Sequence, residues 1–219
     1  NGNFTLNSGE ISGNTATEGS GGNIYNGGTF VMNGGTVGKS SSPALFYNFY
    51  NTTTKLYGGN FYENIYSYSD IEAKVEANIT GQIEFVETGV LTIENYAGTT
   101  PKYTIRVAST REKGAIIVFK GGSETAPDLS KIVIGGYDTN NYVISCEKDS
   151  NNVWTIGLSQ RKTTVTFNPT FGTCETTSKV VDYGATYGDL PSAYYQGHVF
   201  NGWSRNYFVA GNYKGTYQG

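Results

Sequence analysis

Charged residues are scarce in this sequence: 15 lysines and arginines and 18 acidic residues make up 15% of 219 residues. An average globular chain has about 25%. The net charge of −3 leaves no basic excess to bind a phosphate backbone, so we expect no nucleic-acid partner. No apolar run approaches the ~20 residues of a membrane span, and the first residues lack the regions of a signal peptide. We therefore expect no membrane insertion within this chain.

Residues that carry redox, metal or nucleophilic chemistry are also few. The only histidine is His198, and one histidine does not by itself make a Ser/His/Asp triad or a His-rich metal site. The two cysteines, Cys146 and Cys174, lack the C-x-x-C spacing of zinc and redox motifs. We expect no cofactor, no metal and no catalytic residue.

Glycine and aromatic residues are abundant instead, with 30 Gly, 18 Tyr and 11 Phe. Apolar residues alternate with polar ones over short stretches between Gly-rich corners, the pattern of short β-strands. Helical periodicity is almost absent, and the best helical turn is expected at 69–77. The sequence therefore predicts an all-β protein.

An internal repeat organises the first third of the chain. NFTLNSGEI at 3–11 matches TFVMNGGTV at 29–37, and TTKLYGGNF at 53–61 is a looser copy. A period in the mid-twenties suits one turn of a parallel β-helix, in which aligned apolar residues stack inward. The expected apolar columns are Phe4, Phe30 and Thr54; Leu6, Met32 and Leu56; and Ile11, Val37 and Phe61. Gly9, Gly35 and Gly59 form a glycine column, and Asn7 and Asn33 predict an amide ladder at a turn.

Strand-like segments continue to about residue 160, and we expect them to be further turns of the same β-helix. They lie at 82–86, 90–93, 103–107, 115–119, 131–134, 142–145 and 153–156. The segments 126–131, 142–145 and 153–157 together resemble the closing part of extracellular bacterial right-handed β-helix proteins. A solenoid needs an end cap, for which Trp154 is a candidate. Because the chain starts in mid-repeat, we expect it to be a fragment of a longer protein.

The composition changes at 160–162, which predicts two domains, 1–160 and 161–219. The second contains TVTFN at 164–168, SKVVDYG at 178–184, TYGDLP at 186–191 and GHVFNGW at 197–203. This order resembles the Listeria–Bacteroides repeat, or internalin-type B repeat, a small β-grasp-like module. Asn201 stands where the family often has Asp, and the family's closing strand ending in Trp is missing. Two alternatives follow: the B repeat is incomplete, or the segment 212–217 completes it. Phe200 and Trp203 would anchor its small core.

This resemblance implies a secreted or cell-wall-attached bacterial protein. The fold class expected for the whole chain is a right-handed parallel β-helix followed by a β-grasp-like B repeat. Such proteins serve adhesion or presentation, with glycans or host surface proteins as ligands, and a purely structural spacer is an alternative. The extracellular setting also permits a disulfide between Cys146 and Cys174, provided that their Cα atoms approach within about 7 Å.

An enzyme is a further alternative, because polysaccharide lyases and glycoside hydrolases share the β-helix fold. These enzymes need clustered carboxylates. The acids of this chain are scattered, and Glu63 and Asp70 are the two that would be tested first for catalysis. We expect no enzymatic activity.

The densest unusual feature is an aromatic-rich stretch that begins with FYNFY at 46–50. Alternation along strands sends some of these rings into the core and others outward. Outward tyrosines on successive turns would form a stacking surface for sugar rings or a protein partner, whereas the alternative is that they only fill and shield the solenoid. The expected ligand-binding residues are Tyr57, Tyr62, Tyr66 and Tyr68.

Overall fold

The computed structural model describes residues 2–16, 22–41, 45–209 and 212–218. The chain divides into two compact units, residues 1–160 and 161–219, which we call the β-helix unit and the C-terminal unit. Almost all of the regular structure is β-strand, and the one short helix in these described ranges is a 3₁₀ turn, η1 (Leu129–Lys131). The all-β prediction is confirmed.

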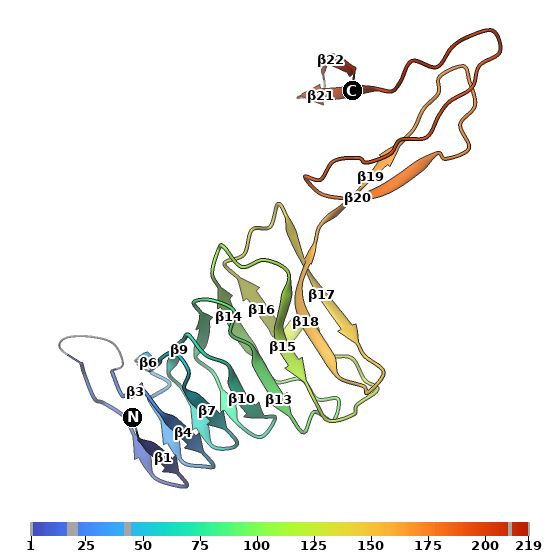
Figure 1. The fold of residues 1–219 in the computed structure, drawn as a ribbon. Helices are drawn as coiled ribbons and strands as arrows, with labels where there is room; N and C mark the ends of the chain where they lie inside the picture. The colour runs from blue at the N-terminus through green and yellow to red at the C-terminus, as the bar shows by residue number, and fades with distance from the viewer. Residues whose placement is uncertain (1, 17–21, 42–44, 210–211, 219) are drawn as a thin grey trace. The chain divides into compact units, whose positions relative to one another are not determined.

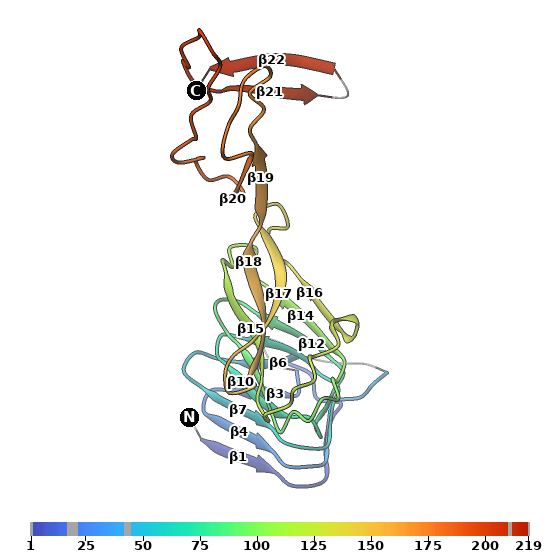
Figure 2. The same ribbon diagram turned by 90° about the vertical axis from the view of Figure 1, so that its right-hand side faces the viewer.

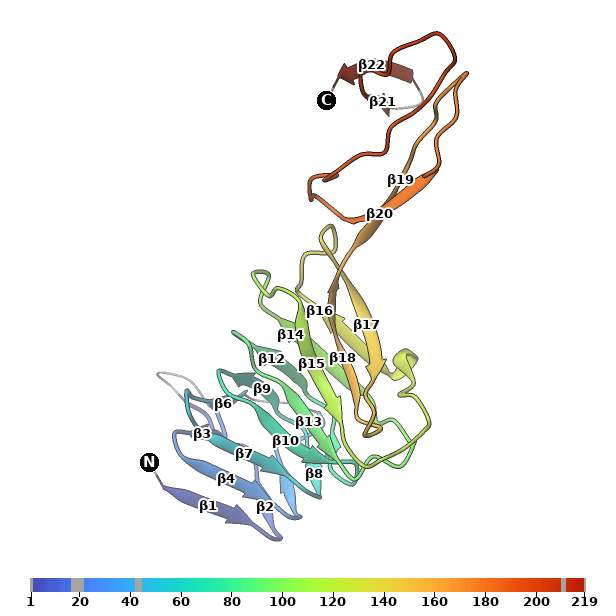
Figure 3. The same cartoon turned by 45° about the vertical axis from the view of Figure 1, so that its right-hand side comes forward.

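Three sheets wrap around the core of the β-helix unit, as Figures 1 and 3 show. The first, sheet A, contains eight strands in the order β1 (Asn3–Leu6), β4 (Thr29–Met32), β7 (Thr53–Leu56), β10 (Ile71–Lys74), β13 (Leu91–Glu94), β15 (Gly114–Phe119), β18 (Trp154–Gln160) and β17 (Tyr142–Lys148). Sheet B contains β2 (Glu10–Ile11), β5 (Thr36–Val37), β8 (Asn60–Phe61) and β11 (Asn78–Ile79). Sheet C contains β3 (Ile24–Asn26), β6 (Leu45–Asn48), β9 (Asn64–Ser67), β12 (Gln82–Phe85), β14 (Tyr103–Val107) and β16 (Ile132–Gly135).

The predicted repeat is confirmed as the register of parallel strands. Phe4 pairs with Phe30 and Phe30 with Thr54 across β1, β4 and β7. The same pairing joins the second column on sheet A, Leu6, Met32 and Leu56, and the third column on sheet B, Ile11, Val37 and Phe61. Successive turns therefore place equivalent side chains directly above one another, and an inward apolar residue on one turn covers the face that its neighbour would expose.

The corner after each sheet A strand explains the glycine and asparagine columns. Gly35 and Gly59 have φ of +83° and +82°, and a Cβ on Gly59 would lie 2.4 Å from the carbonyl oxygen of Gly35. Only glycine fits this left-handed, closely stacked backbone. At the same corner Asn33 Nδ2 donates to Asn7 Oδ1 at 2.9 Å, which confirms the predicted amide ladder.

A second, buried amide ladder runs along the inside of sheet C. Asn26 Nδ2 donates to Asn48 Oδ1 at 3.0 Å, and Asn48 Nδ2 donates to Ser67 Oγ at 2.8 Å. Thr54 Oγ1, from sheet A, donates to the same Asn48 oxygen at 2.8 Å. Buried polar groups are tolerated when they are hydrogen-bonded, and this ladder joins three turns inside the core.

The C-terminal end of the β-helix differs from the prediction that every later strand is a further turn. Strands β12 to β16 continue the parallel pattern, but β18 pairs antiparallel with both β15 and β17. This hairpin ends the sheet because the chain reverses instead of completing another turn. Trp154 lies in it, half-buried, with Nε1 donating to the Ser123 carbonyl at 2.8 Å. Trp154 therefore belongs to the closing hairpin.

The helical turn predicted at 69–77 is wrong. The segment contains strand β10, in which Ile71 and Ala73 point into the core while Glu72 and Lys74 point outward. Two parallel neighbours, β7 and β13, take its backbone hydrogen bonds. Tertiary pairing between turns outweighs the helical spacing of a few acidic and apolar residues.

The C-terminal unit contains two antiparallel pairs, β19 (Lys162–Thr166) with β20 (Ser178–Asp182), and β21 (Ser204–Val209) with β22 (Asn212–Gln218), as Figure 2 shows. Phe167 is buried, and its ring lies 5.2 Å from that of Trp203. Phe200 packs edge-on against Trp203 at 5.4 Å, as the small predicted core requires. The β-grasp topology of a B repeat stays a prediction.

Both cysteines are free thiols. Cys146 is half-buried on β17 in the β-helix unit, whereas Cys174 Sγ donates to the Thr176 carbonyl at 3.0 Å in the C-terminal unit. Burial, and secondarily Glu147, raises the pKa of the Cys146 thiol. Since the thiolate is the reactive form, Cys146 is poorly reactive in the folded chain.

Alkylation of the unfolded chain tests the thiol assignment. Without reductant, in denaturant, we expect two alkyl groups per chain by intact-mass measurement, because neither sulfur is bonded. A chain that takes up alkyl groups only after reduction would instead establish the disulfide between Cys146 and Cys174.

Candidate functional site

Six aromatic residues cluster on the outer surface of sheet C and its adjoining corner. Strands β3, β6 and β9 pair in register, which places Tyr25, Tyr47 and Tyr66 in one outward column. We call the whole cluster the aromatic patch; its members are Tyr25, Tyr47, Phe49, Tyr50, Tyr66 and Tyr68.

The rings of the first column are stacked with an offset. Tyr25 and Tyr47 have centroids 5.3 Å apart and planes 6° apart, and Tyr47 and Tyr66 have centroids 5.7 Å apart and planes 25° apart. These values lie within the range of favourable offset stacking. The parallel backbone thus fixes the orientation of each ring through its neighbour one turn away.

The residues just beyond the same strands form a second aromatic group beside this column. Tyr68 contacts Tyr47 at 6.0 Å, Tyr66 at 5.7 Å and Tyr50 at 4.2 Å between centroids. Phe49 packs edge-on against Tyr50 at 5.3 Å. Each ring of the patch is therefore held by at least one other ring.

The phenol groups of the patch also interact through their hydroxyls. Partial burial, followed by a hydrogen bond with Tyr68, raises the pKa of Tyr47 to about 12. A hydrogen bond with Tyr68 is the first cause that raises the pKa of Tyr66. The raised pKa values of Tyr47 and Tyr66 keep both phenols protonated and neutral at physiological pH.

Solvent reaches several of these rings. Tyr25 is 54% exposed, and Phe49 and Tyr50 are each 41% exposed. Carboxylates lie at one border: Glu84 follows Tyr66 in the register column, and Glu87 Oε1 accepts a hydrogen bond from the Tyr50 hydroxyl at 3.1 Å. The surface therefore combines exposed aromatic carbon with hydroxyl and carboxylate groups.

The structure brings together only two of the four tyrosines predicted to bind, Tyr66 and Tyr68. Tyr57 lies after β7 on sheet A, where its hydroxyl donates to Glu72 and Lys74 Nζ lies 4.6 Å from its ring centroid. Lys55 forms an ion pair with the same Glu72 at 3.3 Å. The polar and charged groups around Tyr57 thus bind one another.

Tyr62 lies on a third side of the solenoid. It follows β8 in sheet B, and its backbone N–H donates to the Val37 carbonyl at 2.9 Å. The prediction that all four tyrosines share one surface is therefore corrected: Tyr57, Tyr62 and the Tyr66–Tyr68 pair are associated with three different sheets. Conversely, the four patch members Tyr25, Tyr47, Phe49 and Tyr50 were not in the predicted set.

The two candidate catalytic acids, Glu63 and Asp70, lie apart, and each accepts a hydrogen bond from a neighbouring turn. Glu63 is fully buried between β8 and β9, and its Oε1 accepts from Asn23 Nδ2 at 2.6 Å. Asp70 is exposed, and its Oδ1 accepts from the Val90 backbone N–H at 2.9 Å. Within the described ranges, no group of three or more His, Cys, Asp and Glu side chains could hold a metal ion. His198 stacks on Tyr195 at 4.7 Å between centroids.

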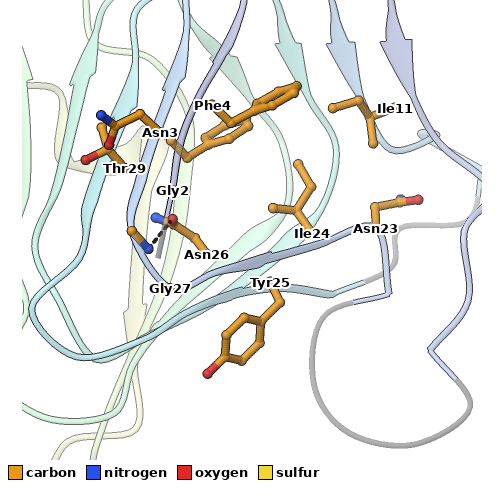
Figure 4. Close-up of a pocket in the computed structure, with 12 residues that line it drawn as sticks. Gly2, Asn3, Phe4, Ile11, Asn23, Ile24, Tyr25, Asn26, Gly27 and Thr29 are labelled. Carbon is orange, nitrogen blue, oxygen red and sulfur yellow. Dashed lines mark hydrogen bonds between the residues drawn. The ribbon is translucent and has the colours of Figure 1, made fainter.

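One pocket, of about 560 Å³, lies at the N-terminal end of the β-helix (Figure 4). Its apolar lining includes the half-exposed Phe4, and Ile11 and Ile24, which pack against the core. Tyr25 also borders it, but its lining contains no acid, base or cysteine. The pocket is therefore the end of the hydrophobic core and lacks the paired carboxylates of a glycoside hydrolase.

Comparisons with known proteins add no relative. No protein-family model matches the sequence, and no curated protein or solved structure matches it significantly. In the part of the chain that the structure describes, no helix has the length and apolar character needed to cross a bilayer.

Proposed function

We propose that this chain belongs to a secreted or surface-attached bacterial protein in which the β-helix is a rigid scaffold and the aromatic patch binds a glycan. The observation that carries the proposal is the patch itself, with six aromatic rings on three successive turns, three of them more than 40% exposed. Contiguous apolar surface of this kind marks interaction sites.

A glycan suits the chemistry of the patch. The C–H faces of pyranose rings pack on aromatic rings, and sugar hydroxyls bond to phenols and carboxylates. Tyr50 with Glu87, and Tyr66 beside Glu84, supply those polar groups next to exposed ring carbon. The rings are already ordered by stacking, so ligand binding costs little side-chain entropy.

The contrast with sheet A favours the patch over other surfaces. There the outward charges are paired across turns, Lys55 with Glu72 at 3.3 Å and Lys120 with Glu94 at 3.2 Å. A ligand would have to break these pairs. On sheet C it meets exposed aromatic carbon instead.

The extracellular location is supported by the order of motifs in 164–203, which resembles the internalin-type B repeat. The contact between Phe200 and Trp203, the pair predicted to anchor the core, is consistent with that module. In this proposal the C-terminal unit is a stalk or contact module, and the β-helix presents the patch away from the cell.

An array of plant and host glycans, together with extracellular matrix proteins, tests the proposal. We expect the chain to bind a glycan and the variant Tyr66→Ala/Tyr68→Ala to lose that binding. The matched control is Tyr57→Ala/Tyr62→Ala, which removes two tyrosines outside the patch and should bind like the unmodified chain. If the unmodified chain bound no glycan and no protein on the array, the result would contradict the proposal and favour a spacer role for the β-helix. Binding only to a protein would contradict the glycan class.

A further inference from the structure

Three tyrosines of the aromatic patch, on successive turns, are stacked with their rings side by side. Because β3, β6 and β9 are parallel and in register, Tyr25, Tyr47 and Tyr66 leave the backbone in the same direction. Their rings are offset-stacked at 5.3 and 5.7 Å. The hydroxyl end of each phenol therefore lies beside the hydroxyl end of the next, which brings together the ring carbons ortho to the hydroxyls.

Tyr68 extends this arrangement sideways. Its ring is 4.2 Å from that of Tyr50 and 5.7 Å from that of Tyr66, between centroids. Its ring also contacts that of Tyr47, at 6.0 Å between centroids. Five tyrosine pairs in the patch are thus in ring contact, and Tyr47 or Tyr68 belongs to every one of them.

We propose that the aromatic patch is an oxidative cross-linking site, at which tyrosines of adjacent turns couple to form dityrosine. A peroxide-driven one-electron oxidant is the co-reactant. Each phenol loses one electron and one proton, the two phenoxyl radicals form a bond between their ortho carbons, and the ring hydrogens shift to the oxygens. One hydrogen peroxide takes up the two electrons and two protons and yields two water molecules.

The surroundings of the patch suit this chemistry. Tyr25 and Tyr50 are exposed, so an external oxidant reaches them. Glu87, 3.1 Å from the Tyr50 hydroxyl, is placed to accept the phenol proton as the electron leaves. By contrast, Tyr96 is buried, and its ring contacts that of Phe119, which has no phenol and cannot couple.

A dityrosine bond between turns would be a covalent cross-link within the β-helix. Tyr25, Tyr47 and Tyr66 belong to three successive turns, so each link closes a loop of the chain onto its neighbour. Such closure restricts the unfolded chain and raises the melting temperature. The cross-link would stabilise a solenoid whose one cysteine, Cys146, is a free thiol.

Trypsin separates the relevant tyrosines, which makes the test specific. Cleavage after Lys39, Lys55 and Lys74 places Tyr25 in peptide 1–39, Tyr47 and Tyr50 in 40–55, and Tyr66 and Tyr68 in 56–74. Dilute protein is treated with a peroxidase and hydrogen peroxide, and the monomer is isolated and digested. We expect dityrosine fluorescence in the monomer, and joined peptides 1–39 with 40–55 and 40–55 with 56–74, each lighter by two hydrogen atoms.

The variant Tyr47→Phe/Tyr68→Phe keeps every ring but breaks all five tyrosine contacts, so it should lose both joined peptides and the intramolecular fluorescence. The control Tyr57→Phe/Tyr62→Phe also removes two phenols, both of them from 56–74, and should cross-link like the unmodified chain. Equal cross-linking in both variants, or links found only in dimers, would overturn the proposal. Tyr→Phe changes keep the stacking surface, so this test is independent of glycan binding.

Discussion

Replacing Phe46 by alanine should lower the free energy of unfolding of the β-helix unit by about 3 to 5 kcal/mol. Phe46 is fully buried on β6, and its ring packs edge-on against Phe30 and Phe61, each at 5.3 Å between centroids. These neighbours come from sheets A and B, so the substitution opens a cavity where all three sheets meet. Chemical denaturation followed by Trp154 fluorescence, in a Trp203→Phe background, measures the change for this unit.

The matched control for this prediction is Phe49→Ala. Phe49 lies three residues further on and is 41% exposed in the aromatic patch, so its removal opens no cavity. We expect a loss of no more than about 1 kcal/mol, the size of an aromatic pair contact. Equal losses for the two variants would mean that Phe46 does not occupy the centre of the core.

Replacing Asn48 by alanine should cost about 3 kcal/mol, because buried hydrogen-bonding groups would lose their partner. The Asn48 side chain is fully buried; it donates to Ser67 and accepts from Asn26 and Thr54. It also accepts from the half-buried Thr52 hydroxyl at 2.7 Å. Alanine removes the donor and the acceptor at once, and Asn26, Thr54 and Ser67 are buried away from solvent. The same denaturation experiment measures the loss.

Asn33→Ala is the corresponding control, since it removes an amide from the exposed ladder. Asn33 bonds to Asn7 at 2.9 Å, in contact with solvent. Water can replace that bond, so we expect a loss of about 0.5 kcal/mol. If Asn48→Ala were no more destabilising than Asn33→Ala, the buried ladder would not support the turns as described.

The fold of the first turns could be predicted because the sequence repeats. Parallel strands in register place equivalent residues one period apart, so aligning the repeats was the same as reading the register. The end of the solenoid could not be found in this way. The strands β17 and β18 alternate like any others, and only their antiparallel pairing distinguishes a closing hairpin from a further turn.

The buried polar residues were missed for a related reason. Asn26 and Asn48 follow outward tyrosines, where asparagine ordinarily marks a turn. In the structure they point inward and satisfy each other across turns. Glu63, which the sequence analysis named only as a candidate catalytic acid, is likewise buried. A single sequence does not tell which polar residues find partners inside a core.

The candidate site was predicted in part. The aromatic-rich stretch pointed to the right region, and Tyr66 and Tyr68 lie in the patch. Tyr57 and Tyr62 do not, because the corners of the solenoid turn them onto other sheets. Tyr25 was missed although a signal was present: an apolar residue, tyrosine and asparagine occur at 24–26 and again at 46–48, the pair that stacks at 5.3 Å.

The most direct test of the aromatic patch as a glycan-binding surface is a calorimetric titration with the best glycan from the array. The unmodified chain, Tyr66→Ala/Tyr68→Ala and Tyr57→Ala/Tyr62→Ala would be compared at matched thermal stability. Loss of two stacking contacts should weaken binding by about tenfold or more for the first variant. The second variant should keep the Kd of the unmodified chain. Equal Kd values for all three proteins would contradict the account, because they would place the bound glycan away from the aromatic patch.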